Sequence, residues 1–165
     1  MPRESKGVLY VVATPIGNLE DMTLRAIKIL KLVQLVAAED TRRTGILLRH
    51  FEIATPILSV HEHNEHARVE RIIGRLAKGE SVALVTDAGT PGISDPGAAL
   101  VSAIREAGFT VEPIPGASAV AAAISASGVT SHGFTFLGFP PIRLKDRKIW
   151  FADAVESSSC LSWTV

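Results

Sequence analysis

The sequence predicts an α/β fold with an open parallel sheet and helices on both faces. Short runs rich in β-branched residues alternate with amphipathic segments of helical length along most of the chain. Strands separated by such helices pair in parallel, because right-handed crossovers return the chain to the same edge of the sheet and place helices on its faces. The most unusual sequence follows each strand, where ligands of parallel sheets collect.

The first half of the chain predicts three strands and two helices. Each strand is a short apolar run, and each helix is a longer segment with apolar residues at helical spacing. The expected elements are a strand at 8–12, a helix from about 21 to 32, a strand at 35–37, a helix at 41–51 and a strand at 57–60.

The second half predicts three helices and two strands. Val69, Ile72, Ile73 and Leu76 keep helical spacing within residues 65–78, and Gly79 supplies a stop. Asp95 and Pro96 together are typical of an N-cap followed by a first-turn proline. The expected elements are a helix at 65–78, a strand at 81–86, a helix from Asp95 to about 107, a strand at 110–113 and a helix at 117–127.

A candidate domain boundary follows these five units. Residues 134–139 form an apolar run typical of a sixth strand, and they precede Pro140, Pro141 and a basic stretch at 143–148. We therefore expect one α/β domain at residues 1–133. Residues 134–165 would be a linker and the beginning of a second domain.

Composition restricts the class of protein. The hydrophobic fraction of 47% and mean hydropathy of +0.27 exclude a wholly disordered chain. Lys and Arg number 17 and so do Asp and Glu, so any nucleic acid would bind a local patch rather than a general basic field. The single cysteine, Cys160, excludes an intrachain disulfide and suits a reducing cytoplasm. No apolar run of about 20 residues and no signal peptide are present, so we expect a cytoplasmic protein without a membrane anchor.

Several common ligand motifs are missing. No Gly-x-Gly-x-x-Gly follows the first strand and no Gly-Lys-Ser/Thr occurs, which disfavours nicotinamide and nucleoside triphosphate chemistry. The cluster of His61, Glu62, His63 and His66 does not have metalloprotease spacing, and it stands where a helix begins. It can cap that helix or contact substrate, and we expect no metal site.

The loop at residues 87–95 carries the strongest local signal. Two acids, three glycines (Gly89, Gly92 and Gly97) and two prolines occur within eleven residues, so the backbone can approach a ligand closely. Backbone N–H groups near a helix start can hold a carboxylate, and an aspartate can pair with an ammonium. The loop therefore suits a ligand with a zwitterionic tail. The alternative is a structural turn with Asp95 as a helix cap.

Three other strand ends have two interpretations each. The segments at 15–18 and 115–118 can approach a ligand through their glycines or serve as plain turns, with Ser118 as an N-cap. Glu39 and Asp40 can act as a base, and Arg42 and Arg43 can hold phosphate. The alternative for the last group is a solvated helix start.

These segments together resemble the tetrapyrrole methylase superfamily and, within it, the small-subunit ribosomal RNA cytidine 2′-O-methyltransferases. Five blocks appear in the family's order and cover about residues 8–140. They are LYVVATPIGNLED at 9–21, AEDTR at 38–42, HEHNE at 61–65, DAGTPGISDPG at 87–97 and PGAS at 115–118.

The resemblance implies a fold, a cofactor and an oligomeric state. The fold would be a five-stranded parallel sheet of order 3-2-4-1-5 followed by a second α/β domain. The cofactor would be S-adenosyl-L-methionine (AdoMet), held between the domains of a homodimer. The cofactor-binding residues that it implies are Pro15, Gly17, Asp87, Ala88, Gly89, Ser94, Pro115, Gly116, Ala117 and Ser118.

Substrate residues follow from the same matched blocks. The candidates for binding substrate are Thr41, Arg42, Arg43, His61, His63 and Asn64, and those for the base are Glu39 and Asp40. The expected reaction is methylation of a cytidine ribose 2′-hydroxyl in the decoding region of small-subunit ribosomal RNA, free or in the assembled subunit. Alternatives are a precorrin or uroporphyrinogen C-methyltransferase on the same fold and a non-catalytic AdoMet-binding remnant.

The chain departs from the family after residue 139. Family members continue for another α/β domain that includes a Glu-Ser/Ala-Pro-His-Arg block, which this sequence lacks. Residues 143–156 can form the first helix of that domain, but residues 157–165 do not resemble it. We therefore expect a chain truncated after its N-terminal domain.

Overall fold

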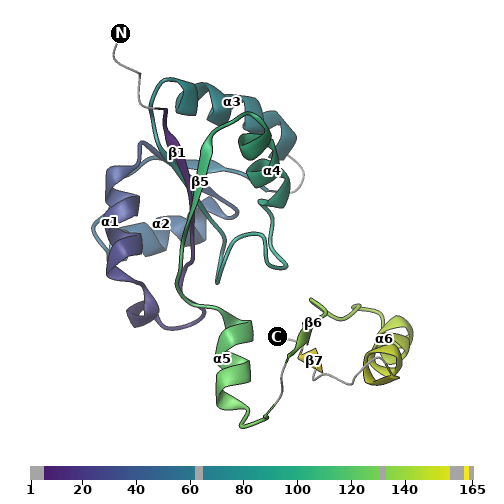
Figure 1. The fold of residues 1–165 in the computed structure, drawn as a ribbon. Coiled ribbons are helices and arrows are strands. Elements are labelled where there is room, and N and C mark those ends of the chain that lie inside the picture. Colours follow the sequence, from purple (N-terminus) through teal and green to yellow (C-terminus); the bar gives the residue numbers. More distant parts are fainter. Residues whose placement is uncertain (1–5, 62–64, 131–132, 157–161, 164–165) are drawn as a thin grey trace. The chain divides into compact units, whose positions relative to one another are not determined.

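The structure is a computed structural model that describes residues 6–61, 65–130, 133–156 and 162–163. The chain divides into two compact units, Met1–Ala117 and Ser118–Val165 (Figure 1). The predicted domain boundary after residue 133 lies beyond this division, and it stays a prediction.

A five-stranded sheet forms the centre of the first unit. Its strands are β1 (Val8–Val12), β2 (Leu35–Ala38), β3 (Ile57–Ser59), β4 (Val82–Val85) and β5 (Thr110–Ile114). They lie in the order β3-β2-β4-β1-β5, and every pair is parallel. The predicted α/β class and strand order are confirmed, and all five strands end at the same edge.

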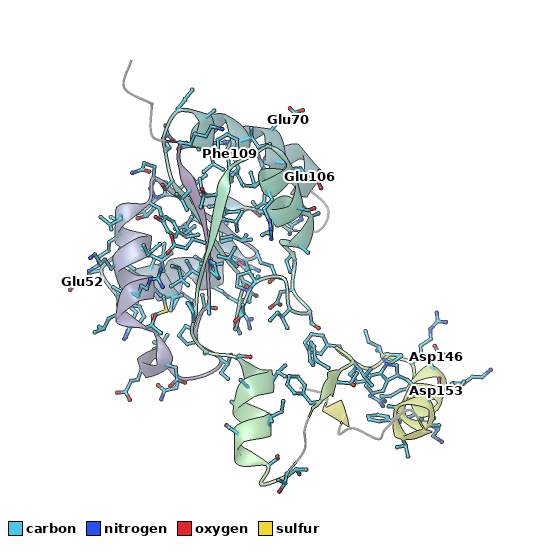
Figure 2. All side chains as sticks on the ribbon, viewed as in Figure 1. Glu52, Glu70, Glu106, Phe109, Asp146 and Asp153 are labelled. Atoms are coloured by element: carbon cyan, nitrogen blue, oxygen red, sulfur yellow. The ribbon has the colours of Figure 1, made fainter. Side chains whose placement is uncertain are left out.

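Four helices cover the two faces of this sheet. The helices are α1 (Leu24–Leu32), α2 (Thr41–His50), α3 (Glu65–Ala77) and α4 (Ala98–Glu106). Figure 1 shows α1 and α2 on one side of the sheet and α3 and α4 on the other. Glu52, after α2, and Glu70, on α3, point outward from these opposite layers (Figure 2).

Alternation along the strands divides the core into two clusters. On β2, Val36 and Ala38 pack in the cluster that contains α1 and α2, whereas Leu35 and Ala37 pack in the cluster with α3 and α4. Successive side chains of a strand point to opposite faces, so a strand buried on both faces is apolar throughout. All four residues of β2 and all four of β4 are buried accordingly.

Two helix starts differ from the predictions. The segment before α1 forms a short 3-10 helix, η1 (Leu19–Asp21), and α1 begins only after Thr23, whose hydroxyl accepts from the Ala26 N–H at 3.1 Å. The prediction that Asp95 caps α4 was wrong. The N-cap is Gly97, which has a φ of 116° and no side chain to accept a hydrogen bond.

The second unit contains α5 (Ala119–Ala126), β6 (Thr135–Phe136), α6 (Leu144–Glu156) and β7 (Ser162–Trp163). Ser118 caps α5, because its hydroxyl accepts from the Ala121 N–H at 3.4 Å. The predicted strand at 134–139 is reduced to two residues, which pair in parallel with β7. Among the described residues, none of the helices combines the length and apolarity that a membrane span requires.

Candidate functional site

The loops after β1, β4 and β5 are tied together at the carboxyl edge of the sheet. Thr14 and Gly89 form an isolated antiparallel bridge, with N···O distances of 2.8 and 3.0 Å. The buried Thr14 hydroxyl donates to the Thr86 carbonyl at 3.1 Å. Gly89 has a φ of 82°, a conformation that L side chains rarely adopt. The loop of the strongest sequence signal is therefore fixed to the loop after β1.

The loop after β5 approaches the same edge closely. A side chain at Gly116 would place its Cβ 3.0 Å from the Cβ of Ala13, so the absence of a side chain there permits the approach. The Thr90 hydroxyl also donates to the Ala117 carbonyl at 3.4 Å. Residues 13–17, 86–92 and 115–117 therefore form one connected rim.

A pocket of about 410 Å³ opens beside this rim. Its walls come from the loop after β1, the loop after β4 and one face of α2. The lining residues are Thr14, Pro15, Ile16, Gly17, Leu19, Arg43, Thr44, Ile46, Leu47, Thr86, Asp87 and Ala88. The pocket therefore combines an apolar wall with one carboxylate and one guanidinium, which suits an amphipathic ligand.

The Asp87 carboxylate joins the loop after β4 to the first turn of α2. Its Oδ1 accepts from the backbone N–H of Asp40 at 3.2 Å, and its Oδ2 accepts from Nη1 of Arg43 at 3.1 Å. A charged hydrogen bond of this kind is stronger than a neutral one. The helix start and the loop are consequently held by a single side chain.

Three carboxylates gather around this contact. Burial raises the pKa of Glu39, and the charges of Asp87 and Asp95 raise it further, against the Asp87 amide and Arg43, which lower it. Burial, followed by the charge of Asp87, also raises the pKa of Asp95, while the Thr86 hydroxyl lowers it. Glu39 therefore binds a proton more readily than an exposed glutamate does.

Asp40 has the opposite environment. It caps α2 by accepting from the Arg42 N–H at 2.8 Å, and Nη2 of Arg42 lies 3.0 Å from its Oδ2. The hydrogen bond from the Arg42 side chain, helped by the backbone amide, lowers the pKa of Asp40 to about 2. Asp40 is therefore a carboxylate committed to helix capping.

The structure brings some of the predicted site residues together and not others. Pro15, Gly17, Asp87, Ala88 and Arg43 line the pocket, and Gly89 lies next to it through its bridge to Thr14. The remaining residues do not line the pocket: Ser94, Pro115, Gly116 and Ala117 stand in the loops around the rim, Thr41 and Arg42 lie on α2, and half-buried His61 follows β3. Ser118 belongs to the second unit, and His63 and Asn64 lie outside the described residues.

The apolar wall of the pocket was missed in the sequence. Ile46 and Leu47 stand three and four residues after Arg43, so the three side chains share one face of α2. Apolar residues at this spacing ordinarily indicate a core face, and that interpretation concealed their role. Ile16 and Leu19, inside a block already singled out, carried a usable signal. No group of three metal-ligating side chains occurs in the part of the chain that the structure describes.

The fold is that of a class of methylases. The structure of uroporphyrin-III-C-methyltransferase from Thermus thermophilus superposes on this chain with a TM-score of 0.60 and 26% sequence identity. The match covers 83% of this chain and 64% of that protein. A putative cobalamin synthesis related protein from Corynebacterium diphtheriae has the same fold, with a TM-score of 0.59 and 21% identity over 82% of this chain and 65% of its own. The family model of the Tetrapyrrole (Corrin/Porphyrin) Methylases matches residues 8–136, and the chain belongs to that family.

Curated relatives are more similar still. The chain is 54% identical over 142 residues to "Ribosomal RNA small subunit methyltransferase I" of Synechocystis sp., which covers 86% of this chain and 51% of the relative. The protein of the same name from Xylella fastidiosa is 56% identical over 86% of this chain and 52% of its own length. The protein of that name from Escherichia coli O157:H7 is 50% identical over 87% of this chain and 50% of its own length. The chain thus spans about half the length of the curated relatives it matches.

Proposed function

We propose that this chain forms the AdoMet-binding part of an enzyme that methylates a cytidine ribose 2′-hydroxyl in the decoding region of small-subunit ribosomal RNA. The observation that carries the proposal is the identity of 50 to 56% to relatives named for methylation of that RNA. The enzyme would work in the cytoplasm, as a homodimer, on the RNA or the assembled small subunit.

The pocket has the chemistry that AdoMet requires. Ile16, Leu19 and Ile46 offer an apolar surface suited to the adenine ring. Each Asp87 oxygen accepts one hydrogen bond, from Asp40 or from Arg43, and keeps a second lone pair that can accept from ribose hydroxyls or the ammonium of the methionine portion. Gly17 and Gly89 leave the backbone accessible beside these groups. When bound, the cofactor supplies a methyl group on a positively charged sulfur. The protein's task is then to align the hydroxyl with it and receive a proton.

Glu39 fits the role of base better than Asp40. A base works best when its pKa is near the working pH, and the surroundings of Glu39 raise its pKa whereas those of Asp40 lower it to about 2. Asp40 also has its oxygens occupied by Arg42. We therefore assign the proton acceptor to Glu39 and leave Asp40 the role of capping α2.

A second candidate function is C-methylation of a tetrapyrrole. It is favoured by the 26% identity and shared fold with the uroporphyrin-III-C-methyltransferase, and it would use the same pocket for the same cofactor. The AEDTR and HEHNE blocks favour the RNA substrate instead. A remnant that binds AdoMet without catalysis is the third possibility.

Parallel assays separate the three functions. Radiolabelled AdoMet is offered with small ribosomal subunits from a strain lacking the corresponding gene, and separately with uroporphyrinogen III. Label in the subunit RNA alone supports the proposal, and label in the tetrapyrrole alone supports the second candidate. Binding of AdoMet in a calorimetric titration, with no transfer to either substrate by this chain or by the chain joined after about residue 140 to the second half of a curated relative, supports the third.

A further inference from the structure

The two adjacent arginines at the start of α2 are placed differently. Arg42 pairs with Asp40 of its own turn, and its side chain is 89% exposed. Arg43 lines the pocket and pairs with Asp87 of the loop after β4. Consecutive helical residues point about 100° apart, so one arginine can face the pocket while the other faces solvent.

The partner of Arg43 has a structural task as well. The Asp87 carboxylate accepts one hydrogen bond from Nη1 of Arg43 at 3.1 Å and another from the backbone N–H of Asp40 at 3.2 Å. Arg43 therefore completes a clamp from the loop after β4 to the first turn of α2. Arg42 lies beside this clamp, and its guanidinium donates its hydrogen bonds to Asp40 and not to Asp87, although the Asp87 charge also acts on it.

We propose that Arg43 is a positioning residue of the site, which acts through Asp87 to fix the helix start and to supply positive charge beside Glu39, and that Arg42 does neither. The proposal rests on the proposed function for what the site does, but not for the arrangement of these side chains. The proposal gives different roles to Arg42 and Arg43, which the sequence analysis assigned together to substrate binding.

The electrostatic surroundings of Glu39 give the proposal a specific readout. The charged groups that act on Glu39 are Asp87 and Asp95 from the loop after β4 and Arg43 from α2. Arg43 is the cation among these three groups. Removing its charge leaves the negative charges of Asp87 and Asp95 acting on Glu39 without the positive charge that counters them. The pKa of Glu39 should then rise further, whereas a purely structural contact would leave the titration unchanged.

Three variants test this in the 165-residue chain. Arg43→Gln removes the charge and keeps a good helix former, Arg43→Lys keeps the charge without the guanidinium fork, and Arg42→Gln is the matched control. The side-chain carboxyl carbon of Glu39 is titrated by NMR in each. We expect a higher pKa of Glu39 in Arg43→Gln and the wild-type titration in Arg43→Lys and Arg42→Gln.

Hydrogen exchange at the Asp40 amide tests the clamp separately. Loss of the Arg43 contact should speed exchange there roughly two- to fivefold, the range expected for an exposed ion pair, in Arg43→Gln but not in Arg42→Gln. Equal effects of Arg42→Gln and Arg43→Gln on the titration and the exchange, or no effect of either, would overturn the proposal.

A kinetic readout connects the proposal to catalysis. If Glu39 accepts the proton, Arg43→Gln should move the acidic limb of the rate profile for methyl transfer to higher pH, and Arg43→Lys should restore it. The rates are measured with the chain joined after about residue 140 to the second half of a curated relative, and absence of methyl transfer by that joined protein at any pH would count against the proposed function. The titration and exchange experiments would still decide the role of Arg43.

Discussion

Leu84 fills the space that any side chain at position 97 would need. A Cβ built on Gly97 would lie 2.8 Å from Cδ2 of Leu84, which is buried in the cluster beneath α3 and α4. Gly97 also has a φ of 116°. Position 97 therefore requires glycine both for the backbone conformation and for the close packing of the loop on β4.

Replacing this glycine should destabilise the first unit. Gly97→Ala adds a strained φ and an overpacked contact, and we expect the free energy of unfolding to fall by about 2–4 kcal/mol. Gly108→Ala is the control, because Gly108 has a φ of 78° with open space around its Cβ and should lose only about 1–2 kcal/mol. Chemical denaturation measures both. Equal losses of unfolding free energy in the two variants would show that the Leu84 side chain moves aside without a cost in stability.

The same contact explains where the sequence prediction of α4 went wrong. Asp95 and Pro96 have the residue types of a cap and a first turn, and residue types were the only information available. The chain instead turns at Gly97, because the loop must pass close to Leu84. The strand order and the five strands of the sheet were predictable, since apolar runs and the family's motifs determine them. A three-dimensional contact between residues 84 and 97 leaves no local pattern.

Gly89 should matter for the cofactor, whereas Gly92 should not. The two glycines have φ values of 82° and 81°, so valine at either position should cost about 1–3 kcal/mol of stability. A side chain at position 89 would also contact Ile16, which lines the pocket, at 3.6 Å, whereas position 92 has no neighbour within 4 Å. We expect Gly89→Val to weaken AdoMet binding at least about tenfold and Gly92→Val to leave it unchanged in calorimetric titrations.

Weaker binding in Gly92→Val alone would place the cofactor near Gly92 instead of Gly89, and unchanged affinity in both variants would place it away from the loop after β4. Circular dichroism on each variant shows that the chain remains folded. The stability cost is shared by the two substitutions, so a difference in affinity reports on the pocket alone.

Glu39 should make stability depend on pH in a defined direction. Its pKa is raised in the folded protein, chiefly by burial, so the folded state binds this proton more tightly than the unfolded chain does. The cost of ionising it begins as pH rises past the ordinary value of 4.5 and is complete above the raised value. Glu39→Gln should therefore melt above wild type at pH 7, with the difference shrinking towards pH 4.

Glu70→Gln is the matched control for that series, because Glu70 is exposed on the outer side of α3 (Figure 2). It should leave the melting temperature unchanged at both pH values. A melting temperature of Glu39→Gln that is lower than wild type at pH 7 would mean that the carboxylate makes stabilising contacts that outweigh its burial.

The candidate site was predictable in its loops but not in its helical wall. The loops could be recognised from their glycine, proline and acidic residues, which are more concentrated there than in the turns at the other ends of the strands. The parallel sheet then brings these loops to one edge. Ile46 and Leu47 belong to a helix whose apolar spacing looks the same whether it faces a core or a pocket. The separation of Arg42 from Arg43 likewise depends on which partner each finds in space.

The proposed function transfers the methyl group to a ribose oxygen of small-subunit ribosomal RNA. Tritiated AdoMet is added to small subunits that lack the modification, with this chain alone and with the chain joined after about residue 140 to the second half of a curated relative. We predict label in the RNA with the joined protein and little with the chain alone. The labelled cytidine should resist alkaline hydrolysis at its 3′ phosphodiester, because a methylated 2′-oxygen cannot attack the phosphorus. Label on an alkali-sensitive nucleotide, or no label in RNA incubated with the joined protein, would rule out 2′-O-methylation of this RNA.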